Sequence, residues 1–367
     1  MGMRIIYDHK IFWSQKYGGI SRYFINIFKN LKGNKKIDFK IIAPFYQNIY
    51  LNYEIENKKI FGIYLKKKIP KTSFLYEKFN NFFFTNAAHK FKPNLIHSTY
   101  YNESIKKKDK PLIITVYDLI HEKLALKENK RIYPKLKSLK MADHIISISK
   151  KTKEDLMKFY NIEENRISVT HLGSNHALLK DNEYELINQQ KPHILYVGSR
   201  EKYKNFEFFL KGYSLSSKLK NDLNIVLFGG GKLSNNERKM IDELKLNNKV
   251  FHKEGDDKKL YNLYKSSKVF IFPSIYEGFG LPLVEAMVNN CPVICSKNQI
   301  FEEIAGDAVE YFDPTNLENF KEKVEEVVYS NSRIEELKLL GKKKSNDYNW
   351  EKCTSDTLKI YRKFKKD

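Results

Sequence analysis

The chain has 367 residues, of which 41% are hydrophobic and 14% aromatic, which is enough apolar material for real cores and excludes global disorder. Its length suits two α/β domains. The formal net charge of +22 predicts an anionic partner, which could be nucleic acid, lipid headgroups or a small anionic substrate. A lysine- and asparagine-rich codon usage would scatter the same charge over the surface without a dedicated patch, and both interpretations stay open.

The three cysteines do not form a disulfide framework, and no Cys or His residues lie at zinc-ligand spacing. We therefore expect buried thiols, no metal site and a reducing, cytoplasmic compartment. The amino terminus, MGMRIIYDH, is typical of a first strand rather than a signal peptide. No apolar run approaches the roughly 20 residues of a membrane span, so we expect a protein that is soluble or peripheral on the inner face of a membrane.

The first half alternates short β-branched runs with amphipathic segments. Strands are predicted at residues 4–7, 39–43, 94–98, 112–116 and 144–149. Helical spacing of apolar residues follows in ISRYFINIFKNLK, and Ser149 is suited to cap a helix over SKKTKEDLMKFY. This alternation predicts a parallel sheet with crossover helices.

The second half restarts the same alternation after a polar stretch at residues 181–190, where we place the linker. Its predicted strands are residues 193–197, 224–229, 268–272, 292–296 and 308–312, and a last helix is predicted over 350–364. We expect an α/β protein with one Rossmann-like domain at 1–182, a second at 183–348 and a C-terminal helix at 349–367. Two such sheets would face a shared ligand cleft with their carboxyl ends.

The segment FPSIYEGFGLPLVEA, residues 272–286, carries the strongest chemical pattern. A strand runs into a loop with Glu277 and two glycines, Gly278 and Gly280, and then into a helix that contains Glu285. Glycines allow close backbone approach to a ligand, and the start of a helix favours a phosphate. Glu277 could accept hydrogen bonds from sugar hydroxyls and Glu285 could reach a ribose, although two solvated glutamates beside a turn would look the same.

A second pattern places cations at another strand end. In YVGSREKYKNF, Arg200 and Lys204 precede a helix, where the helix dipole disfavours positive charge unless an anion lies between them. A diphosphate would explain this position, and the alternative is two surface cations.

Two further segments are weaker. Gly18 and Gly19 follow the first strand and could let a phosphate approach, but neither this pair nor VLFGGGKL matches the G-x-G-x-x-G fingerprint, which disfavours a nicotinamide enzyme. Asp118 and His121 follow the strand at 112–116 and could hold a hydroxyl or transfer a proton, or they could serve only local hydrogen bonds.

Taken together, these segments resemble the retaining glycosyltransferases of family 4. Glu277 and Glu285 match the family's E-x7-E motif, YVGSREKYKNF matches its G-x-R-x3-K-N segment, and YGGISRY matches its N-terminal glycine loop. The segments ADHIISISKKTKEDL, VTHLGS, AGDAVEYFDP and NWEKCTSDTLKIY also follow its usual order. The resemblance covers most of the chain and is least clear at residues 47–88.

The resemblance implies the GT-B fold, with the donor held mainly by the second domain and a C-terminal helix that crosses back to the first. In family terms Arg200 and Lys204 bind the donor diphosphate, Glu277 holds the transferred sugar and Glu285 binds the ribose. The remaining implied donor contacts are Gly18, Gly19, Gly278, Phe279, Gly280 and Leu281. Asp118, His121 and Arg22 are implied on the acceptor or sugar side; many relatives have His-Asp where this chain has Tyr117–Asp118, so Tyr117 or His121 must replace that histidine.

The sequence therefore predicts a metal-independent hexosyltransferase with a nucleotide-diphosphate sugar as co-substrate, GDP-mannose-like by preference, and no cofactor. The acceptor is expected to be a saccharide or lipid-linked saccharide in surface polysaccharide synthesis. The alternatives are a nucleotide-sugar epimerase of the same fold and a basic nucleic-acid-binding protein, for which no recognition motif is present. The lysine- and aromatic-rich residues 64–84 could contact an anionic membrane, or could form an amphipathic core helix with a basic face.

Overall fold

The computed structural model describes residues 2–69, 71–105, 107, 109–124, 129–174 and 192–365. The chain divides into two compact units, one formed by Met1–Gly173 together with Trp350–Asp367, the other by Ser174–Asn349. The predicted linker and the predicted boundary at 182/183 lie outside the described residues.

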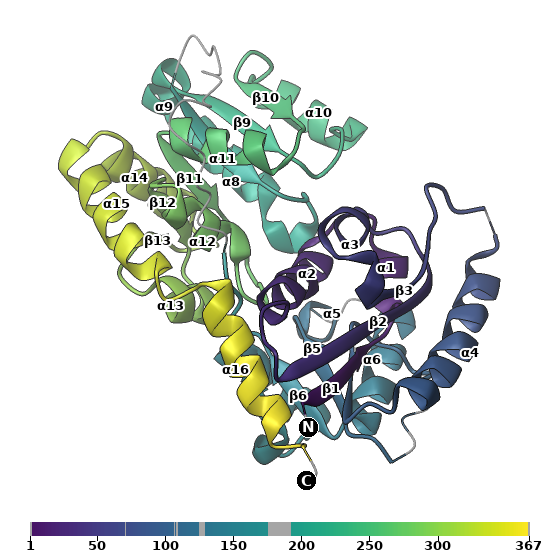
Figure 1. The fold of residues 1–367 in the computed structure, drawn as a ribbon. Helices are drawn as coiled ribbons and strands as arrows, with labels where there is room; N and C mark the ends of the chain where they lie inside the picture. Colours follow the sequence, from purple (N-terminus) through teal and green to yellow (C-terminus); the bar gives the residue numbers. More distant parts are fainter. Residues whose placement is uncertain are drawn as a thin grey trace. The chain divides into compact units, whose positions relative to one another are not determined.

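The first unit is built on a parallel sheet with the strand order β3-β2-β1-β4-β5-β6-β7. Its described strands are β1 (Met3–Tyr7), β2 (Ile37–Tyr46), β3 (Ile60–Tyr64), β4 (Leu95–Ser98), β5 (Leu112–Val116), β6 (His144–Ser147) and β7 (Ile167–Val169). Its helices are α1 (Lys10–Ser14), α2 (Gly19–Leu31), α3 (Ile49–Glu54), α4 (Ser73–Phe91), α5 (Ile120–Lys123), α6 (Asn129–Met141), α7 (Lys150–Tyr160) and α16 (Trp350–Arg362) (Figure 1).

The second unit repeats this plan with the strand order β10-β9-β8-β11-β12-β13, again parallel throughout. Its described strands are β8 (His193–Val197), β9 (Asn224–Phe228), β10 (Val250–Lys253), β11 (Val269–Phe272), β12 (Val293–Ser296) and β13 (Glu310–Phe312). Its helices are α8 (Phe206–Leu215), α9 (Ser217–Asp222), α10 (Asn235–Glu243), α11 (Asp257–Ser266), α12 (Leu281–Val288), α13 (Gln299–Ala305), α14 (Leu317–Val328) and α15 (Asn331–Ser345).

Numbered within its own unit, each sheet has the order 3-2-1-4-5-6 of the Rossmann fold, and the first sheet adds a seventh strand. The predicted fold class of two parallel Rossmann-like sheets is therefore confirmed. The central strands β5 and β8 are buried along their whole length, as expected where helices cover both faces of a sheet. In each unit the order of the strands switches to the other side of the sheet between the first and fourth strands, and ligands of such folds bind at that point of the carboxyl edge.

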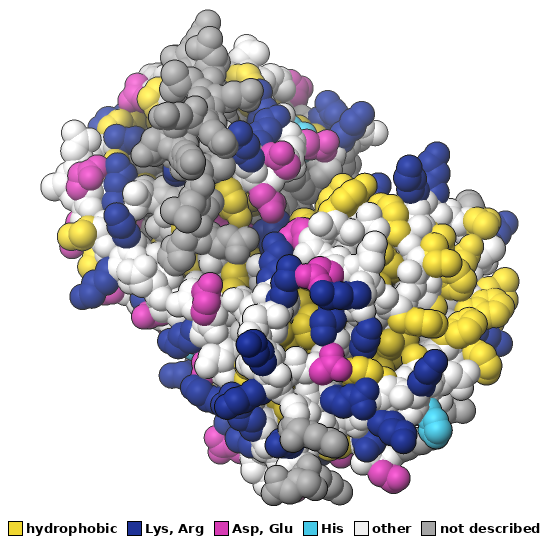
Figure 2. Space-filling model, in the orientation of Figure 1, with side chains coloured by type: hydrophobic (Ala, Val, Ile, Leu, Met, Phe, Trp, Pro, Cys, Tyr) yellow, Lys and Arg dark blue, Asp and Glu magenta, His cyan; other side chains and the backbone are white. Residues whose placement is uncertain are grey.

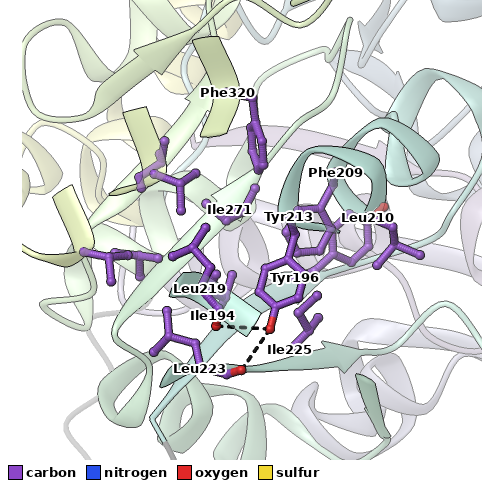
Figure 3. Close-up of a cluster of buried hydrophobic side chains, with 14 of the residues drawn as sticks. Ile194, Tyr196, Phe209, Leu210, Tyr213, Leu219, Leu223, Ile225, Ile271 and Phe320 are labelled. Carbon is purple, nitrogen blue, oxygen red and sulfur yellow. Dashed lines mark hydrogen bonds between the residues drawn. The ribbon is translucent and has the colours of Figure 1, made fainter. Parts of the chain in front are cut away.

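The core of the second unit is aromatic and aliphatic. Tyr213 on α8 lies in a cluster with Ile194, Leu219 and Phe320, and its side chain is fully buried (Figure 3). Its phenol hydroxyl donates to the carbonyl oxygens of Leu223, at 2.9 Å, and Leu219, at 3.4 Å. Burial without such partners would cost stability, and α9 with its C-cap residue supplies both acceptors.

In the first unit, a chain of buried polar groups joins the C-terminal helix to the sheet. The Tyr361 hydroxyl of α16 lies 2.5 Å from Nδ1 of His97 on β4 and 3.1 Å from the hydroxyl of Tyr7 on β1. Nε2 of His97 lies 2.9 Å from the hydroxyl of Thr115 on β5. Burial lowers the pKa of His97 to about 3, so the ring is neutral at pH 7.

We expect Tyr361→Phe to lower the free energy of unfolding of the first unit by about 1–3 kcal/mol, because it leaves buried polar groups unpaired. Urea denaturation measures the loss. The matched change Tyr133→Phe, at an exposed position on α6, should cost no more than about 0.5 kcal/mol. Equal losses in the two variants would contradict a stabilising role for the buried chain.

The lowered pKa of His97 also predicts a pH dependence. The unfolded chain protonates this histidine near pH 6.5, whereas the folded chain does so only near pH 3. Its contribution to stability is therefore complete above about pH 6.5 and is lost as the pH falls, by about 1.4 kcal/mol per pH unit. In denaturation from pH 7 to pH 4, His97→Asn should flatten this slope and the exposed control His89→Asn should keep it; an unchanged slope in His97→Asn would refute the assignment.

Candidate functional site

Three loops of the second unit meet at the carboxyl edge of its sheet. They follow β8, β9 and β11, which are adjacent strands, and they carry the predicted cations, the triple glycine and Glu277. The backbone N–H of Ile275 donates to the carbonyl of Tyr203 at 2.8 Å, and that of Gly198 donates to the carbonyl of Phe228 at 3.0 Å. The three loops are thus tied together through their backbones at the point where ligands bind in folds of this kind.

Helix α12 starts directly from this edge, and its first turn explains the Gly-Leu-Pro sequence. Gly280 is the N-cap residue and has a φ of +87°, a conformation that other residues adopt only with strain. A Cβ atom at Gly280 would also come within 3.0 Å of the Phe301 ring. Pro282 occupies the first turn, where no N–H is needed. Leu281 is the first helical residue, so the N–H groups suited to an anion begin beside it.

Lys204 and Glu277 form an ion pair within this edge. The Lys204 ammonium group contacts Oε1 of Glu277, and the two side chains are 13% and 12% exposed. The same ammonium group lies 5.5 Å from the ring centre of Phe272, the last residue of β11. A partly buried cation and a partly buried carboxylate therefore sit side by side, one suited to a phosphate oxygen and the other to hydroxyl donors.

The structure gives Arg200 a set of partners that the sequence did not reveal. Its side chain is 4% exposed, and its Nε donates to Glu237 at 2.6 Å. Its two terminal nitrogens donate to the carbonyl oxygens of Gly229, Gly230, Gly231 and Lys232 at 2.7–3.2 Å. In this state Arg200 holds the glycine loop after β9 in place, and its predicted contact with a diphosphate stays a prediction.

Glu237 also caps α10, and it thereby connects the glycine loop after β9 to that helix. Its carboxylate accepts from the backbone N–H of Ser234 at 2.6 Å, while the Ser234 hydroxyl caps α10 in return. This reciprocal capping box is readable from the spacing Ser-x-x-Glu. The additional contact with Arg200 has no local sequence signal, because the two residues are 37 positions apart.

Glu285 lies in the second turn of α12 and is largely buried. Its Oε2 accepts a hydrogen bond from Tyr264 of α11 at 3.4 Å. Burial, and then the charge of Glu285, raise the pKa of Tyr264, so the phenol stays protonated and able to donate. Phe279, in the loop before the helix, is also buried and packs edge-on against Tyr348 at 5.5 Å between ring centres. Gly278 precedes it in the same loop.

In the first unit, the glycine pair and Arg22 belong to α2. Gly18 is the N-cap residue of that helix, Gly19 is its first residue, and a Cβ atom at Gly19 would meet nothing within 4 Å. Arg22 donates to the Tyr50 hydroxyl at 3.3 Å, and its guanidinium carbon lies 5.7 Å from the centre of that ring. The helix start is thus open at Gly19, as the predicted approach of a phosphate requires.

Tyr117 and His121, the two candidates to replace the family's histidine, both lie in the segment after β5 but differ in burial. Tyr117 is buried, and its ring lies 5.8 Å from that of Tyr23, so it belongs to the core. Asp118 and His121 are only half-buried, and Asp118 accepts from the backbone N–H of Ile120 at 3.2 Å. His121 is therefore more accessible to a substrate than Tyr117.

A buried lysine that the sequence reasoning missed supports this segment. Nζ of Lys135, on α6, donates to the carbonyl oxygen of Asp118 at 3.1 Å and to Glu122 at 3.0 Å. Both side chains of the pair are about 5% exposed, and Glu122 also accepts from the Tyr160 hydroxyl. A lysine in a lysine-rich helix carries no sequence signal for such a role.

The predicted residues therefore fall into two groups. Arg200, Lys204, Glu277 and the glycine-containing start of α12 gather at one edge of the second unit, with Glu285 one turn further along that helix. Those of the first unit lie on two separate segments, α2 and the residues after β5. Arg200 and Glu285 are both engaged by protein groups in this state.

Comparison with known proteins bears on this arrangement. The family described as Glycosyltransferase Family 4 matches residues 17–178, and the family described as Glycosyl transferases group 1 matches residues 180–345. The chain belongs to these glycosyltransferases. The resemblance read from its motifs is thereby confirmed.

Two of the individual relatives share 28% and 30% sequence identity with this chain over about half of its length. The O-antigen chain mannosyltransferase RfbU of Salmonella typhimurium is 28% identical over 52% of this chain and 52% of its own length. The N-acetylgalactosamine-N,N'-diacetylbacillosaminyl-diphospho-undecaprenol 4-alpha-N-acetylgalactosaminyltransferase of Campylobacter jejuni is 30% identical over 48% of this chain and 46% of its own length. The chain thus spans about half the length of these curated relatives.

Among solved structures, the sucrose-phosphate synthase of Thermosynechococcus elongatus has a TM-score of 0.79 with 17% sequence identity, and the match covers 99% of both chains. At this identity the similarity speaks for the fold alone. The GT-B fold expected from the motifs is confirmed.

Arg200→Lys tests the structural role of this arginine. A lysine cannot reproduce the planar fork that reaches the glycine-loop carbonyls, so we expect the second unit to lose about 1–3 kcal/mol of unfolding free energy. Chemical denaturation without any ligand measures this, and hydrogen exchange should quicken at residues 229–232. Arg238→Lys, an exposed position on the neighbouring α10, is the control and should change stability by less than about 0.5 kcal/mol. Indistinguishable variants would show that the loop does not depend on Arg200.

Proposed function

We propose that this protein is a retaining, metal-independent glycosyltransferase that moves a hexose from a nucleotide-diphosphate sugar to a saccharide or lipid-linked saccharide acceptor. The observation that carries the proposal is the pairing of Lys204 with Glu277 beside the start of α12. In a nucleotide sugar, phosphate oxygens and sugar hydroxyls lie on either side of the anomeric carbon. An adjacent cation and carboxylate match that pattern of charge and hydrogen bonding.

The proposed chemistry follows from where charge develops. Breaking the anomeric C–O bond leaves negative charge on the diphosphate, and preorganised positive groups at that spot lower the barrier. Lys204 and the first N–H groups of α12 are the groups available at this edge. Arg200 would contribute only after exchanging Glu237 or a loop carbonyl for phosphate.

The stereochemical outcome is taken from the family resemblance. Retention without a covalent intermediate requires attack from the face that the diphosphate leaves, with the leaving phosphate oxygen accepting the acceptor's proton. A pair of glycosidase-like carboxylates is then unnecessary. The positive side chains and helix start take the place of a metal ion, so chelation should leave activity intact.

Relatives support the proposed substrates. RfbU is named for mannosyl transfer to an O-antigen chain, and the Campylobacter enzyme for transfer to an undecaprenol-linked saccharide. We propose a GDP-mannose-like donor and an acceptor of surface polysaccharide synthesis, which belongs to the lipopolysaccharide type of pathway. We place the reaction in the cytoplasm, with peripheral contact to the inner membrane face.

The donor site is tested by thermal shift with UDP, GDP, ADP and CMP, with Mg²⁺ and with a chelator. A ligand present at about 100 times its dissociation constant stabilises the folded state by about 2.7 kcal/mol. We expect one nucleoside diphosphate, GDP by preference, to raise the melting temperature without metal. Lys204→Gln and Glu285→Gln should each reduce that rise, whereas Glu254→Gln, an exposed carboxylate, should keep it.

A response to none of these nucleotides would refute the donor site, and a strict need for Mg²⁺ would refute metal independence. Retention is checked separately, by the anomeric configuration of the product in NMR. A product of inverted configuration would overturn the proposed mechanism while leaving the donor site intact.

A further inference from the structure

The first unit exposes a row of large apolar side chains along α4 and the edge strand β3. We call it the α4–β3 face, defined by Phe61, Ile63, Phe74, Leu75, Phe79 and Phe82. These side chains are 48–64% exposed. Figure 2 shows hydrophobic side chains gathered over this part of the unit, where Figure 1 places α4. A continuous apolar surface of this kind marks a place of contact with a partner or a membrane.

The core of the unit does not need this row, because α4 has another face that packs inward. Asn80 and Phe84, one turn apart, are buried under the helix. The Asn80 side chain accepts from the backbone N–H of Phe45 at 2.8 Å and donates to its carbonyl at 3.1 Å, which fixes the rotation of α4 on β2. Phe79 and Phe82 are therefore held outward. The helix is apolar on both faces, unlike an ordinary surface helix, so of the two interpretations of residues 64–84 the structure favours an exposed apolar and basic surface.

The charge around this face is positive. Residues 64–92 contain seven lysines and one glutamate, and that glutamate, Glu77, is paired with Lys10. The exposed lysines are Lys66, Lys67, Lys71, Lys78, Lys90 and Lys92. The Lys78 ammonium group lies 4.5 Å from the centre of the Phe74 ring, so apolar and basic groups are interleaved. A second copy of the chain would bring the same lysines face to face across a two-fold axis, which disfavours self-association.

A groove of about 560 Å³ continues the face between the edge strand and the helix. Phe61 and Phe83 line it, and Arg4, Lys40 and Lys90 bring three cations to it. An apolar channel with basic groups suits a molecule that has a hydrocarbon part and an anionic head. Anionic lipids have this combination, and many of them together form a bilayer surface.

We propose that the α4–β3 face is a docking surface for an anionic lipid bilayer. The exposed aromatic side chains enter the interfacial layer, and the surrounding lysines contact lipid phosphates. None of the described helices is long and apolar enough to span a membrane, so attachment from one side is the form of binding that this face provides. This inference rests on the proposed function, because membrane docking would bring the enzyme to a lipid-linked acceptor.

The test is co-sedimentation of the full chain with vesicles of phosphatidylcholine, with or without phosphatidylglycerol, in the absence of any sugar nucleotide. We expect binding to the anionic vesicles that weakens with salt. The double variant Phe79→Ser with Phe82→Ser should bind at least about tenfold more weakly. Lys66→Gln with Lys67→Gln should lose about fivefold for each lysine at low salt.

The matched control combines Leu339→Ser with Lys343→Gln on α15, where Leu339 is 71% exposed outside this face, and it should bind as the original chain does. Binding that ignores phosphatidylglycerol, or that the α4 variants retain, would overturn the proposal. So would a dimer in light scattering that the Phe79 and Phe82 changes abolish, since a second copy would then cover the face.

The proposed function and the proposed docking surface can be refuted independently, because different experiments test them. Thermal shifts with nucleoside diphosphates report on the second unit and need no lipid. If urea denaturation of the Phe79 and Phe82 variant matches that of the original chain, the first unit is still folded, and a loss of vesicle binding belongs to the α4–β3 face alone. Vesicle binding by a chain that responds to no nucleotide would leave the docking surface standing and refute only the donor site.

Discussion

Parallel pairing of the first strand in each unit is the constraint on which the rest of the structure depends. β8 pairs with β9 on one side and with β11 on the other, both parallel, so the loops after all three strands leave the sheet at one edge. Those loops carry Arg200, the triple glycine and Glu277. Residues spread over about 80 positions of sequence thereby become neighbours.

Within that edge, electrostatics decide how the cations are held. A partly buried ammonium or guanidinium group must find a partner, because desolvation without one is costly. Lys204 pairs with Glu277, and Arg200 pairs with Glu237 and donates to loop carbonyls. In the first unit, Lys135 pairs with Glu122 in the same way. An anionic ligand at the second unit would therefore replace existing partners rather than meet bare cations, and donor binding becomes an exchange of acceptors.

The exposed surface of the first unit around α4 differs from the edge of the second unit in how its cations are placed. Around α4, exposed lysines lie beside apolar side chains, and residues 64–92 contain a single acidic residue, Glu77. The apolar side chains of this surface are exposed to water. The proposed docking on an anionic bilayer would offer anionic groups to the lysines and hydrocarbon to the apolar side chains.

The sequence by itself determined the parts that depend on local backbone preference. It predicted the central strands, the helix that follows Gly278 and Gly280, and the α/β class, because periodicity, glycine conformation and helix capping act over a few residues. It missed the edge strands β3, β7 and β10, whose short or exposed runs lack a buried pattern. Only the tertiary structure decided the partners of Arg200, the burial of Tyr117 and the outward face of α4. Those depend on contacts between residues far apart in the chain, such as Asn80 with Phe45 and Arg200 with Glu237, and no local preference encodes them.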